Sequence, residues 1–231
     1  MTKYFAYGTN CNLAVMEQKG IRFTARQRAV LDGFRLRFNK RSSRESLPER
    51  IGFANIEEDQ EGTVEGILYD LGVDGLETLD ETERHQSHYD RIRVVVNADS
   101  GSEECWTYKA RPEVVAEGLV PSRNYINHIL AGQEFLSQQY FDALDQSQTY
   151  RDTCACCDRE EEVLFVRGND RLHTLCQSCR EARMKWGDVI HRPLSVEETA
   201  AVMRQLVLDG PGFGSIEDLI DEAVRREIIA K

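Results

Sequence analysis

The chain has 231 residues, 41% of them hydrophobic, which is enough for one sizeable domain with a small appendage and excludes disorder throughout. Its formal net charge of −11 argues against a protein that binds nucleic acid by neutralising phosphates, and against one that binds anionic membranes. No apolar run approaches the ~20 residues that a membrane span needs. The first residues also lack the apolar segment of a signal peptide. We therefore expect a soluble, cytoplasmic protein with no membrane association.

The first stretch of the chain, residues 3–7, is short and apolar and predicts a buried strand. Gly8 ends it, and Thr9 and Asn10 are turn formers. A strand that leads into a tight glycine turn presents several backbone N–H groups at one point, which suits the binding of an anion or an oxyanion. We expect the neighbouring Cys11 to be a packing residue.

The elements that follow predict an α+β domain over residues 1–148, in the form of a small mixed β-barrel with flanking helices. Alternating or β-branched apolar residues indicate strands, and apolar residues at a 3.6-residue period indicate helices. The expected strands are residues 33–39, 52–56, 62–71, 92–96 and 105–108. The expected helices are residues 13–19, 74–83 and a long segment that opens at Pro121 and breaks before Tyr140. Residues 40–50 are charged and rich in serine, and predict a loop.

One of the short expected helices carries an acidic side chain on its apolar face. Leu76, Leu79 and Glu83 follow one another at i, i+3 and i+7, so they share one side of the helix. If the leucines face the core, Glu83 points inward or into a cleft, where its carboxylate can accept a proton. The alternative is that Glu83 pairs with Arg84 or Arg91 at the surface.

Six short fragments of the first 148 residues form an ordered set. They are YFAYGTN (4–10), LRFN (36–39), FANI (53–56), GTVEGILYDL (62–71), LDETE (79–83) with Tyr89, and PSRNYINHILAG (121–132) with Tyr140. Their order and spacing resemble the γ-glutamylcyclotransferase-like family, whose members open with a YGSN-type strand and turn and carry a LDxxEG-type helix end. The resemblance implies a small closed β-barrel with helices and a cavity near Glu83. The residues expected to line this cavity and bind substrate are Tyr7, Gly8, Thr9 and Asn10.

The resemblance also implies an enzyme that cleaves γ-glutamyl amides without water. The α-amine of the substrate attacks its own γ-carbonyl, which gives 5-oxoproline and a free amine. A carboxylate must take a proton from that amine and can return one to the leaving nitrogen, and Glu83 suits both steps. The N–H groups of the turn would stabilise the oxyanion, so no metal and no serine or cysteine nucleophile is required for catalysis. Tyr125 either lines the cavity or packs in the core.

Two positions depart from the family pattern. Thr9 stands where the family usually has serine, and it keeps the hydroxyl group. Arg84 stands in place of the glycine that normally follows the catalytic glutamate; it could grip a substrate carboxylate or compromise the base. The alternative function is therefore a non-catalytic module, which would recognise a γ-glutamyl-like ligand in the barrel pocket and signal to a protein partner.

Five of the seven cysteines lie between residues 154 and 179, which in an intracellular chain indicates a metal site more than disulfides. Four of them have the spacing C-x2-C-x18-C-x2-C of a zinc knuckle: Cys154, Cys157, Cys176 and Cys179. A closed four-thiolate site has no open position, so its zinc is expected to be structural. Cys156 is a spare thiol that could replace a neighbour, and His173 could be a ligand in a Cys3His variant.

The rest of the chain is divided into a zinc-knuckle or ribbon segment at residues 149–192 and a helical tail at residues 193–231. The tail is expected to form helices at residues 195–208 and 215–229. Capping-box spacing marks two helix starts, Asp74 with Glu77 and Ser195 with Glu198.

The zinc segment suggests a protein partner. A weaker alternative is a nucleic-acid accessory factor that uses the basic residues near Arg180, which the acidic charge of the chain disfavours.

Overall fold

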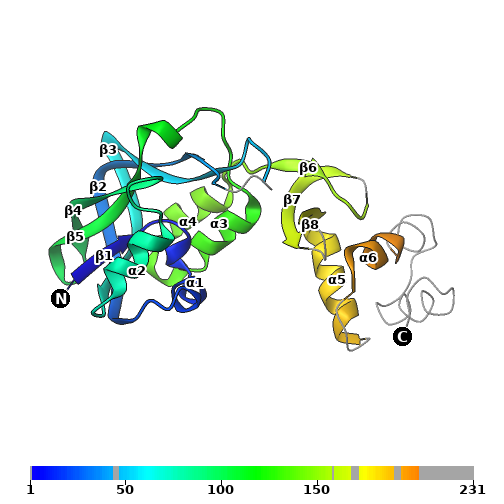
Figure 1. Ribbon diagram of the computed structural model, residues 1–231, viewed down its shortest axis with the longest axis horizontal. Helices are drawn as coiled ribbons and strands as arrows, with labels where there is room; N and C mark the ends of the chain where they lie inside the picture. Colours follow the sequence, from blue (N-terminus) through cyan, green and yellow to red (C-terminus); the bar gives the residue numbers. More distant parts are fainter. Residues whose placement is uncertain (1, 44–46, 158, 168–171, 190–193, 203–231) are drawn as a thin grey trace. The chain divides into compact units, whose positions relative to one another are not determined.

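The computed structural model describes residues 2–43, 47–157, 159–167, 172–189 and 194–202. The chain divides into two units, Met1–Thr149 and Tyr150–Lys231. Their elements are labelled in Figure 1. Within the described residues, no helix combines the length and the apolar composition that crossing a bilayer requires.

A closed barrel of five strands forms the centre of the first unit. The strands are β1 (Thr2–Ala6), β2 (Phe23–Arg41), β3 (Gly52–Leu71), β4 (Tyr89–Ala98) and β5 (Gly101–Ala110). They follow one another around the barrel in the order β1-β3-β2-β4-β5. Neighbours pair antiparallel, except that β1 and β5 close the barrel as a parallel pair, with Tyr4 opposite Trp106. The small mixed barrel predicted from the sequence is thus confirmed.

The strand β3 is longer than the sequence pattern indicates. Residues 52–56 and 62–71, expected as two strands, belong to one strand of 20 residues. Between them, Glu57 and Glu58 remain paired with Arg35 and Phe34 of β2. The guanidinium of Arg35 also forms an ion pair with the carboxylate of Asp59. Opposite charges on neighbouring strands stabilise such a pairing. The prediction of a break at this point was therefore wrong.

The strand β2 also extends beyond the expected residues 33–39 in both directions. It therefore takes in the first residues of the loop expected at 40–50. Its pairing with β3 shifts register between Phe23 and Ala25, between Asp32 and Phe34, and between Arg37 and Lys40. Such bulges bend and twist a strand, which allows one long strand to follow the curve of a barrel.

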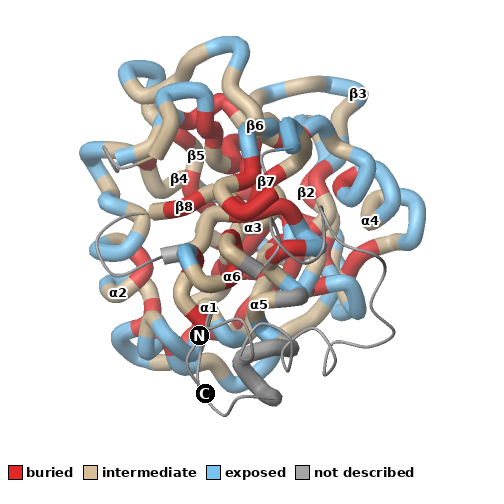
Figure 2. The backbone as a smooth tube through the Cα atoms, turned by 90° about the vertical axis from the view of Figure 1, so that its right-hand side faces the viewer, coloured by how far each residue is buried: buried red, intermediate tan, exposed pale blue. Residues whose placement is uncertain are grey.

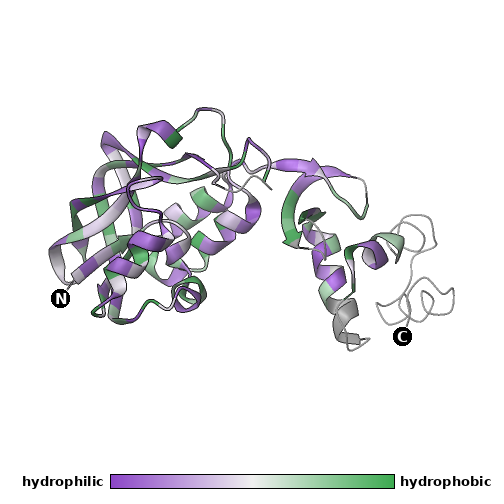
Figure 3. Ribbon diagram, viewed as in Figure 1, coloured by the Kyte–Doolittle hydropathy of each residue, from purple (hydrophilic) through white to green (hydrophobic). Residues whose placement is uncertain are grey.

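Buried side chains form one cluster inside the barrel and another between the barrel and its helices. Phe5 and Ile56 belong to the first cluster, and neither is exposed to solvent. Met16, Tyr69 and Ile129 belong to the second, which joins helices to the strands. Figure 2 shows exposed residues at the loops and strand ends, with buried residues in the interior. Figure 3 shows that hydrophilic and hydrophobic residues intermingle along the barrel strands, as expected when one face of a strand is buried.

Four α-helices flank the barrel: α1 (Leu13–Gln18), α2 (Gly75–Thr82), α3 (Arg123–Leu130) and α4 (Gln138–Asp145). The long helix expected after Pro121 consists of α3 and α4, with a 3-10 turn between them. The side chain of Ser122 caps α3, and that of Ser137 caps α4. Asp74 occupies the N-cap position of α2, but its side chain makes no capping hydrogen bond. Its ψ of 11° lies outside the extended region that a capping side chain requires, so the capping box predicted there does not form.

The second unit contains an antiparallel sheet of three strands in the order β6-β7-β8. Its elements are β6 (Arg151–Thr153), β7 (Glu160–Arg167), β8 (Leu172–Cys176), α5 (Gln177–Val189) and α6 (Val196–Val202). At the start of α6 the predicted capping box is present. The backbone N–H of Ser195 donates to Glu198 Oε2 at 2.9 Å, and the N–H of Glu198 donates to Ser195 Oγ at 3.0 Å. The helix expected at residues 215–229 lies outside the described residues.

Candidate functional site

The strand β1 leads directly into a single 3-10 turn, Thr9–Cys11. The N–H of Cys11 donates to the carbonyl of Gly8 at 3.0 Å, and the hydroxyl of Tyr69 donates to the carbonyl of Asn10 at 2.9 Å. These two bonds fix the turn on the barrel. The first N–H groups of a helical turn have no partner within the turn, and no side chain caps this one. The turn therefore presents N–H groups that are available to a ligand.

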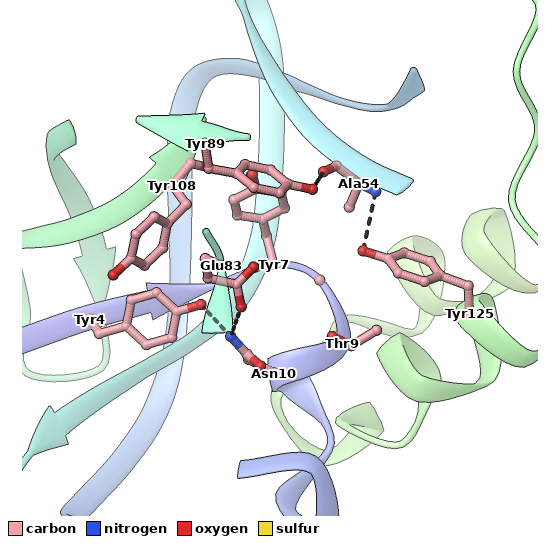
Figure 4. A pocket seen from close by; sticks show the side chains of 10 residues that line it. Tyr4, Tyr7, Thr9, Asn10, Ala54, Glu83, Tyr89, Tyr108 and Tyr125 are labelled. Carbon is pink, nitrogen blue, oxygen red and sulfur yellow. Dashed lines mark hydrogen bonds between the residues drawn. The ribbon is translucent and has the colours of Figure 1, made fainter. Parts of the chain in front are cut away.

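Glu83 lies at the C-terminal end of α2, beside this turn (Figure 4). Its N–H donates to the carbonyl of the buried Leu79 at 2.8 Å, which fixes the end of the helix. Its carboxylate oxygen Oε1 accepts hydrogen bonds from Asn10 Nδ2 at 3.0 Å and from Lys19 Nζ at 2.8 Å. The glutamate side chain is 20% exposed. The two segments that the sequence singled out are thus brought together at one point.

The surface pairing considered for Glu83 is not what the structure contains. Arg91 forms its ion pair with Asp80, at 2.6 Å between Nη1 and Oδ2. The other oxygen of Asp80 accepts a hydrogen bond from the hydroxyl of Tyr108 at 2.7 Å. Glu83 instead forms its ion pair with Lys19, which lies at the C-terminal end of α1. No periodic pattern indicated this lysine, because its role depends on how α1 packs beside the turn.

A hollow that is partly open to solvent lies between the turn and Glu83. Five tyrosines line it. Three of them, Tyr7, Tyr89 and Tyr125, are also mentioned in the sequence analysis. The lining residues are Tyr4, Tyr7, Gly8, Thr9, Asn10, Ala54, Glu83, Tyr89, Tyr108 and Tyr125. Burial raises the pKa of all five tyrosines, so their hydroxyl groups stay protonated at neutral pH. The wall of the hollow thus consists largely of aromatic rings with neutral polar tips.

Most of these hydroxyl groups are already held by the protein. Tyr4 accepts a hydrogen bond from Asn10 Nδ2 at 2.8 Å, and Tyr89 donates to the carbonyl of Ala54 at 2.8 Å. Tyr7 donates to the backbone carbonyl of Tyr108. Figure 4 shows the first two of these bonds, which fix the rings of Tyr4 and Tyr89. The result is a rigid wall.

Tyr125 has both of the roles considered for it. Its ring packs edge-on against Phe53, with the ring centroids 5.1 Å apart, and its hydroxyl accepts a hydrogen bond from the N–H of Ala54 at 3.1 Å. It also lines the hollow, as Gly8 does. A Cβ atom on Gly8 would lie 3.2 Å from the Tyr125 hydroxyl. Glycine at this position therefore keeps the hollow open.

Arg84, the departure from the family pattern, ends α2 in a left-handed conformation with φ of 53°. The N–H of His88 and the hydroxyl of Ser87 both donate to its carbonyl, at 2.9 and 3.0 Å. Glycine adopts this conformation more readily than a residue with a side chain. Arg84 is exposed and does not belong to the lining of the hollow. Its guanidinium therefore does not form part of the wall of the hollow.

The four cysteines with knuckle spacing come together in the second unit, as predicted. The sulfur atoms of Cys154, Cys157, Cys176 and Cys179 all lie within 4.8 Å of one another, and all four residues are buried. The sulfurs of Cys157 and Cys176 are 3.9 Å apart. A tetrahedral zinc with Zn–S bonds of ~2.3 Å needs sulfurs about 3.8 Å apart, so the cluster fits a metal ion of this kind.

Hydrogen-bond donors near the four sulfurs favour their thiolate form. The N–H of Cys176 donates to Cys154 Sγ at 3.3 Å, and Arg159 Nε donates to Cys157 Sγ at 3.4 Å. Cys156 and His173, which the sequence offered as alternative ligands, do not belong to the group of four. The thiol of Cys156 lies 3.7 Å from the carbonyl of Val196, and the imidazole of His173 lies 3.9 Å from the carboxylate of Glu197.

A closed barrel whose first strand ends in a glycine turn beside a helix-terminal glutamate is the architecture that the sequence resemblance implies. A family model described as gamma-glutamyl cyclotransferase, AIG2-like, matches residues 4–127, more than half of the chain. The chain therefore belongs to this family. No significant match to a curated protein was found.

Solved structures share the fold of the first unit. A structure named gamma-glutamyl cyclotransferase has 24% sequence identity and a TM-score of 0.56, covering 64% of this chain and 89% of that one. A Homo sapiens protein described as uncharacterized has 25% identity and a TM-score of 0.56, with the same coverage. YkqA from Bacillus subtilis has 26% identity and a TM-score of 0.55, covering 64% of this chain and 56% of that one.

Proposed function

We propose that this protein is a γ-glutamyl cyclotransferase that releases 5-oxoproline and a free amine from a small-molecule or peptide γ-glutamyl amide. The observation that carries the proposal is that the carboxylate of Glu83 and the glycine turn of β1 border one hollow. A base and a set of N–H donors on the same small cavity are what an intramolecular attack on an amide carbonyl requires.

Glu83 acts as the general base and then as the general acid. Its Oε1 is held by Asn10 and Lys19, and among the described residues no hydrogen bond to Oε2 is found. Oε2 takes a proton from the α-ammonium of the substrate, and the amine nitrogen then forms a bond to the γ-carbon. When the bond between that carbon and the leaving nitrogen breaks, Glu83 gives this proton to the leaving nitrogen, and the second proton lost by the ring nitrogen also passes to the released amine, which leaves as an ammonium ion. The carboxylate is thus ready for another cycle.

The turn stabilises the tetrahedral intermediate. Its negative oxygen is bound by N–H groups among residues 8–10, which are fixed before the reaction because Tyr69 holds the carbonyl of Asn10. Ring closure joins two atoms of one molecule, so holding the substrate folded removes much of the entropic barrier. The hollow is partly open to solvent, which suits a substrate whose γ-glutamyl group enters it while the amine portion extends outward.

The test is the release of 5-oxoproline from a panel of γ-glutamyl amines, amino acids and peptides, measured by mass spectrometry. We expect Glu83→Gln to abolish release while the far-ultraviolet circular dichroism stays unchanged. Glu81→Gln is the matched control, because Glu81 lies on the same helix and is exposed. Undiminished release by the Glu83→Gln variant would contradict the mechanism. Binding of γ-glutamyl compounds without turnover would instead support a ligand-sensing module.

We further propose that the four cysteines of the second unit bind one zinc ion with a structural role. The donors are Cys154, Cys157, Cys176 and Cys179. Zinc favours four thiolates in a tetrahedron, and a site with four protein donors leaves no position for a substrate. The ion then serves to hold the C-x2-C turns together, and this unit supplies a surface for a protein partner. The first unit carries out its reaction without a metal.

A further inference from the structure

A lysine with a buried side chain lies close to the hollow. Lys40, near the end of β2, is only 6% exposed. Its ammonium lies 5.3 Å from the ring centroid of Tyr89 and 5.4 Å from that of Phe53. In the part of the chain that the structure describes, no carboxylate lies within 4.0 Å of this nitrogen. Lysines are almost never buried to this degree without a partner.

The surroundings of Lys40 offset its charge only in part. The faces of two aromatic rings attract a cation, but they do not replace the hydrogen bonds that an ammonium makes in water. Burial lowers the pKa of Lys40 to about 8, so the amine is still mainly protonated at pH 7. A cation on a largely buried side chain, with no carboxylate partner among the described residues, is therefore present at neutral pH, and an anionic ligand would complete its interactions.

Two connections relate this cation to the hollow. The ring of Tyr89, which lies beside the ammonium, also forms part of the wall of the hollow. The negative charge of Glu83 acts on Lys40 and favours its protonated form, which means that the two charges lie within electrostatic reach of each other. The other cations near the site are already engaged or exposed: Lys19 pairs with Glu83, and Arg84 is solvent-exposed.

We propose that Lys40 binds the α-carboxylate of the γ-glutamyl substrate, and that the enzyme therefore selects substrates in which this group is free. The inference rests on the proposed function and adds the group by which the substrate is recognised. In a γ-glutamyl amide the α-carboxylate and the attacking α-amine share one carbon atom. A cation that anchors the carboxylate must therefore lie near the hollow that Glu83 borders, and Lys40 packs against Tyr89 in the wall of that hollow. In a partly desolvated site such an ion pair is stronger than at the surface.

The test measures binding separately from turnover. The probes are γ-glutamyl methylamide and the same molecule with its α-carboxylate converted to a carboxamide, titrated by calorimetry into the full-length Glu83→Gln protein. We expect the carboxylate form to bind at least tenfold more tightly. Adding Lys40→Met should remove this preference by weakening the carboxylate form, with little change for the carboxamide. Lys109→Met is the control, because Lys109 pairs with Glu58 at the surface.

Equal affinity for the two probes, or a preference that survives Lys40→Met, would overturn the role of Lys40. If the wild type nevertheless releases 5-oxoproline, the proposed function stands. A preference that depends on Lys40 without any turnover would retain the binding role and reject the cyclotransferase reaction. Binding of neither probe counts against Lys40.

A measurement on the wild type covers the case in which the Lys40→Met variant fails to fold. The pKa of Lys40 can be followed by NMR of the lysine side chain, with and without 5-oxoproline, a product that keeps the α-carboxylate. A bound carboxylate favours the ammonium form, so we expect the pKa to rise when the product binds. Binding of 5-oxoproline with no change at Lys40 would contradict the proposal.

Discussion

The ammonium of Lys19 lies 2.8 Å from Oε1 of Glu83. The same nitrogen lies 2.7 Å from Oδ1 of Asn10, whose amide nitrogen also donates to Glu83. Three segments that are separate in the sequence, the turn after β1, the end of α1 and the end of α2, are therefore joined by one polar cluster. The carboxylate proposed as the base is held at one oxygen by two donors, which fixes the direction of the other oxygen.

The first prediction concerns this cluster. In the Lys19→Met variant Glu83 loses its ion pair and one of the two donors that orient it. Because small displacements of a catalytic group reduce the rate strongly, we expect kcat to fall about tenfold with a smaller change in KM. Lys19→Arg should retain more activity. Lys3→Met is the control, because Lys3 forms its ion pairs with Asp70 and Glu103. A fully active Lys19→Met enzyme would show that Asn10 alone positions the base.

The second prediction concerns the width of the hollow. In Gly8→Ala the new methyl group would lie 3.2 Å from the hydroxyl of Tyr125 and 3.6 Å from Cβ of Ala54. The φ of Gly8 is −113°, which other residues also adopt, so the effect should be on substrate binding more than on folding. We expect kcat/KM to fall about tenfold, which corresponds to ~1.4 kcal/mol.

A double variant tests whether this loss has a steric cause. Removing the hydroxyl in Gly8→Ala/Tyr125→Phe should recover part of the activity, because it removes the atom nearest to the added methyl group. The four kinetic constants form a double-mutant cycle, in which a steric conflict appears as non-additivity. Additive losses would indicate that Gly8 and Tyr125 act independently.

The third prediction is a pH dependence of stability. Burial lowers the pKa of Lys40 from its ordinary 10.5 to about 8; Glu83 opposes this shift and Arg84 adds to it, while His88 and Tyr89 complete the surroundings. Between these two pH values the unfolded chain binds more protons than the folded one, so the contribution of Lys40 to the free energy of unfolding rises with pH. Below pH 8 the full penalty for burying the charge is present.

Lys40→Met should remove this penalty. We expect the variant to be more stable than the wild type by about 1–2 kcal/mol at pH 7, and the difference to shrink as the pH approaches 10. Urea unfolding of the two proteins at a series of pH values measures it. A variant that is less stable at pH 7 would show that the two aromatic contacts of the ammonium outweigh its desolvation. Such a gain in stability with a loss of substrate binding is typical of functional residues.

The parts of the site that were predictable from the sequence depend on local patterns. Gly8 was recognised because it ends an apolar strand, and Glu83 because it continues the apolar face that Leu79 occupies. Each inference used the geometry of a single element. The meeting of the two segments could not be derived in this way, since it depends on the pairing of β1 with β3, the strand that leads into α2. That expectation came from the resemblance to the family.

The lysines of the site could not be predicted by the same reasoning. Residues 40–50 were interpreted as a loop because they are charged, yet Lys40 is paired within the sheet. Simple alternation would expose one of two consecutive residues, but Asn39 and Lys40 are both buried. The register shift between Arg37 and Lys40 accounts for this, and a bulge of this kind has no clear signal in the sequence.

The fourth prediction concerns the left-handed residue at the end of α2. A side chain at the φ of 53° found for Arg84 adds strain that glycine does not have. We expect Arg84→Gly to raise stability by about 0.5–1 kcal/mol, or by roughly 2–4 °C in Tm per kcal/mol for a chain of this size. Arg84→Ala keeps the Cβ atom and should give no such gain. Equal gains in both variants would point to the charge of Arg84 instead of its backbone.

The fifth prediction concerns the metal. Elemental analysis of the purified protein should find about one zinc ion per chain, and both Cys154→Ser and Cys176→Ser should lose it, because each removes one of four ligands. Since the ion joins the two C-x2-C turns, its loss should expose the second unit to limited proteolysis. Cys156→Ser is the matched control, because Cys156 is equally buried but lies outside the four-sulfur set. It should retain the metal, whereas loss of zinc from Cys156→Ser and not from Cys154→Ser would show that the ligands are assigned incorrectly.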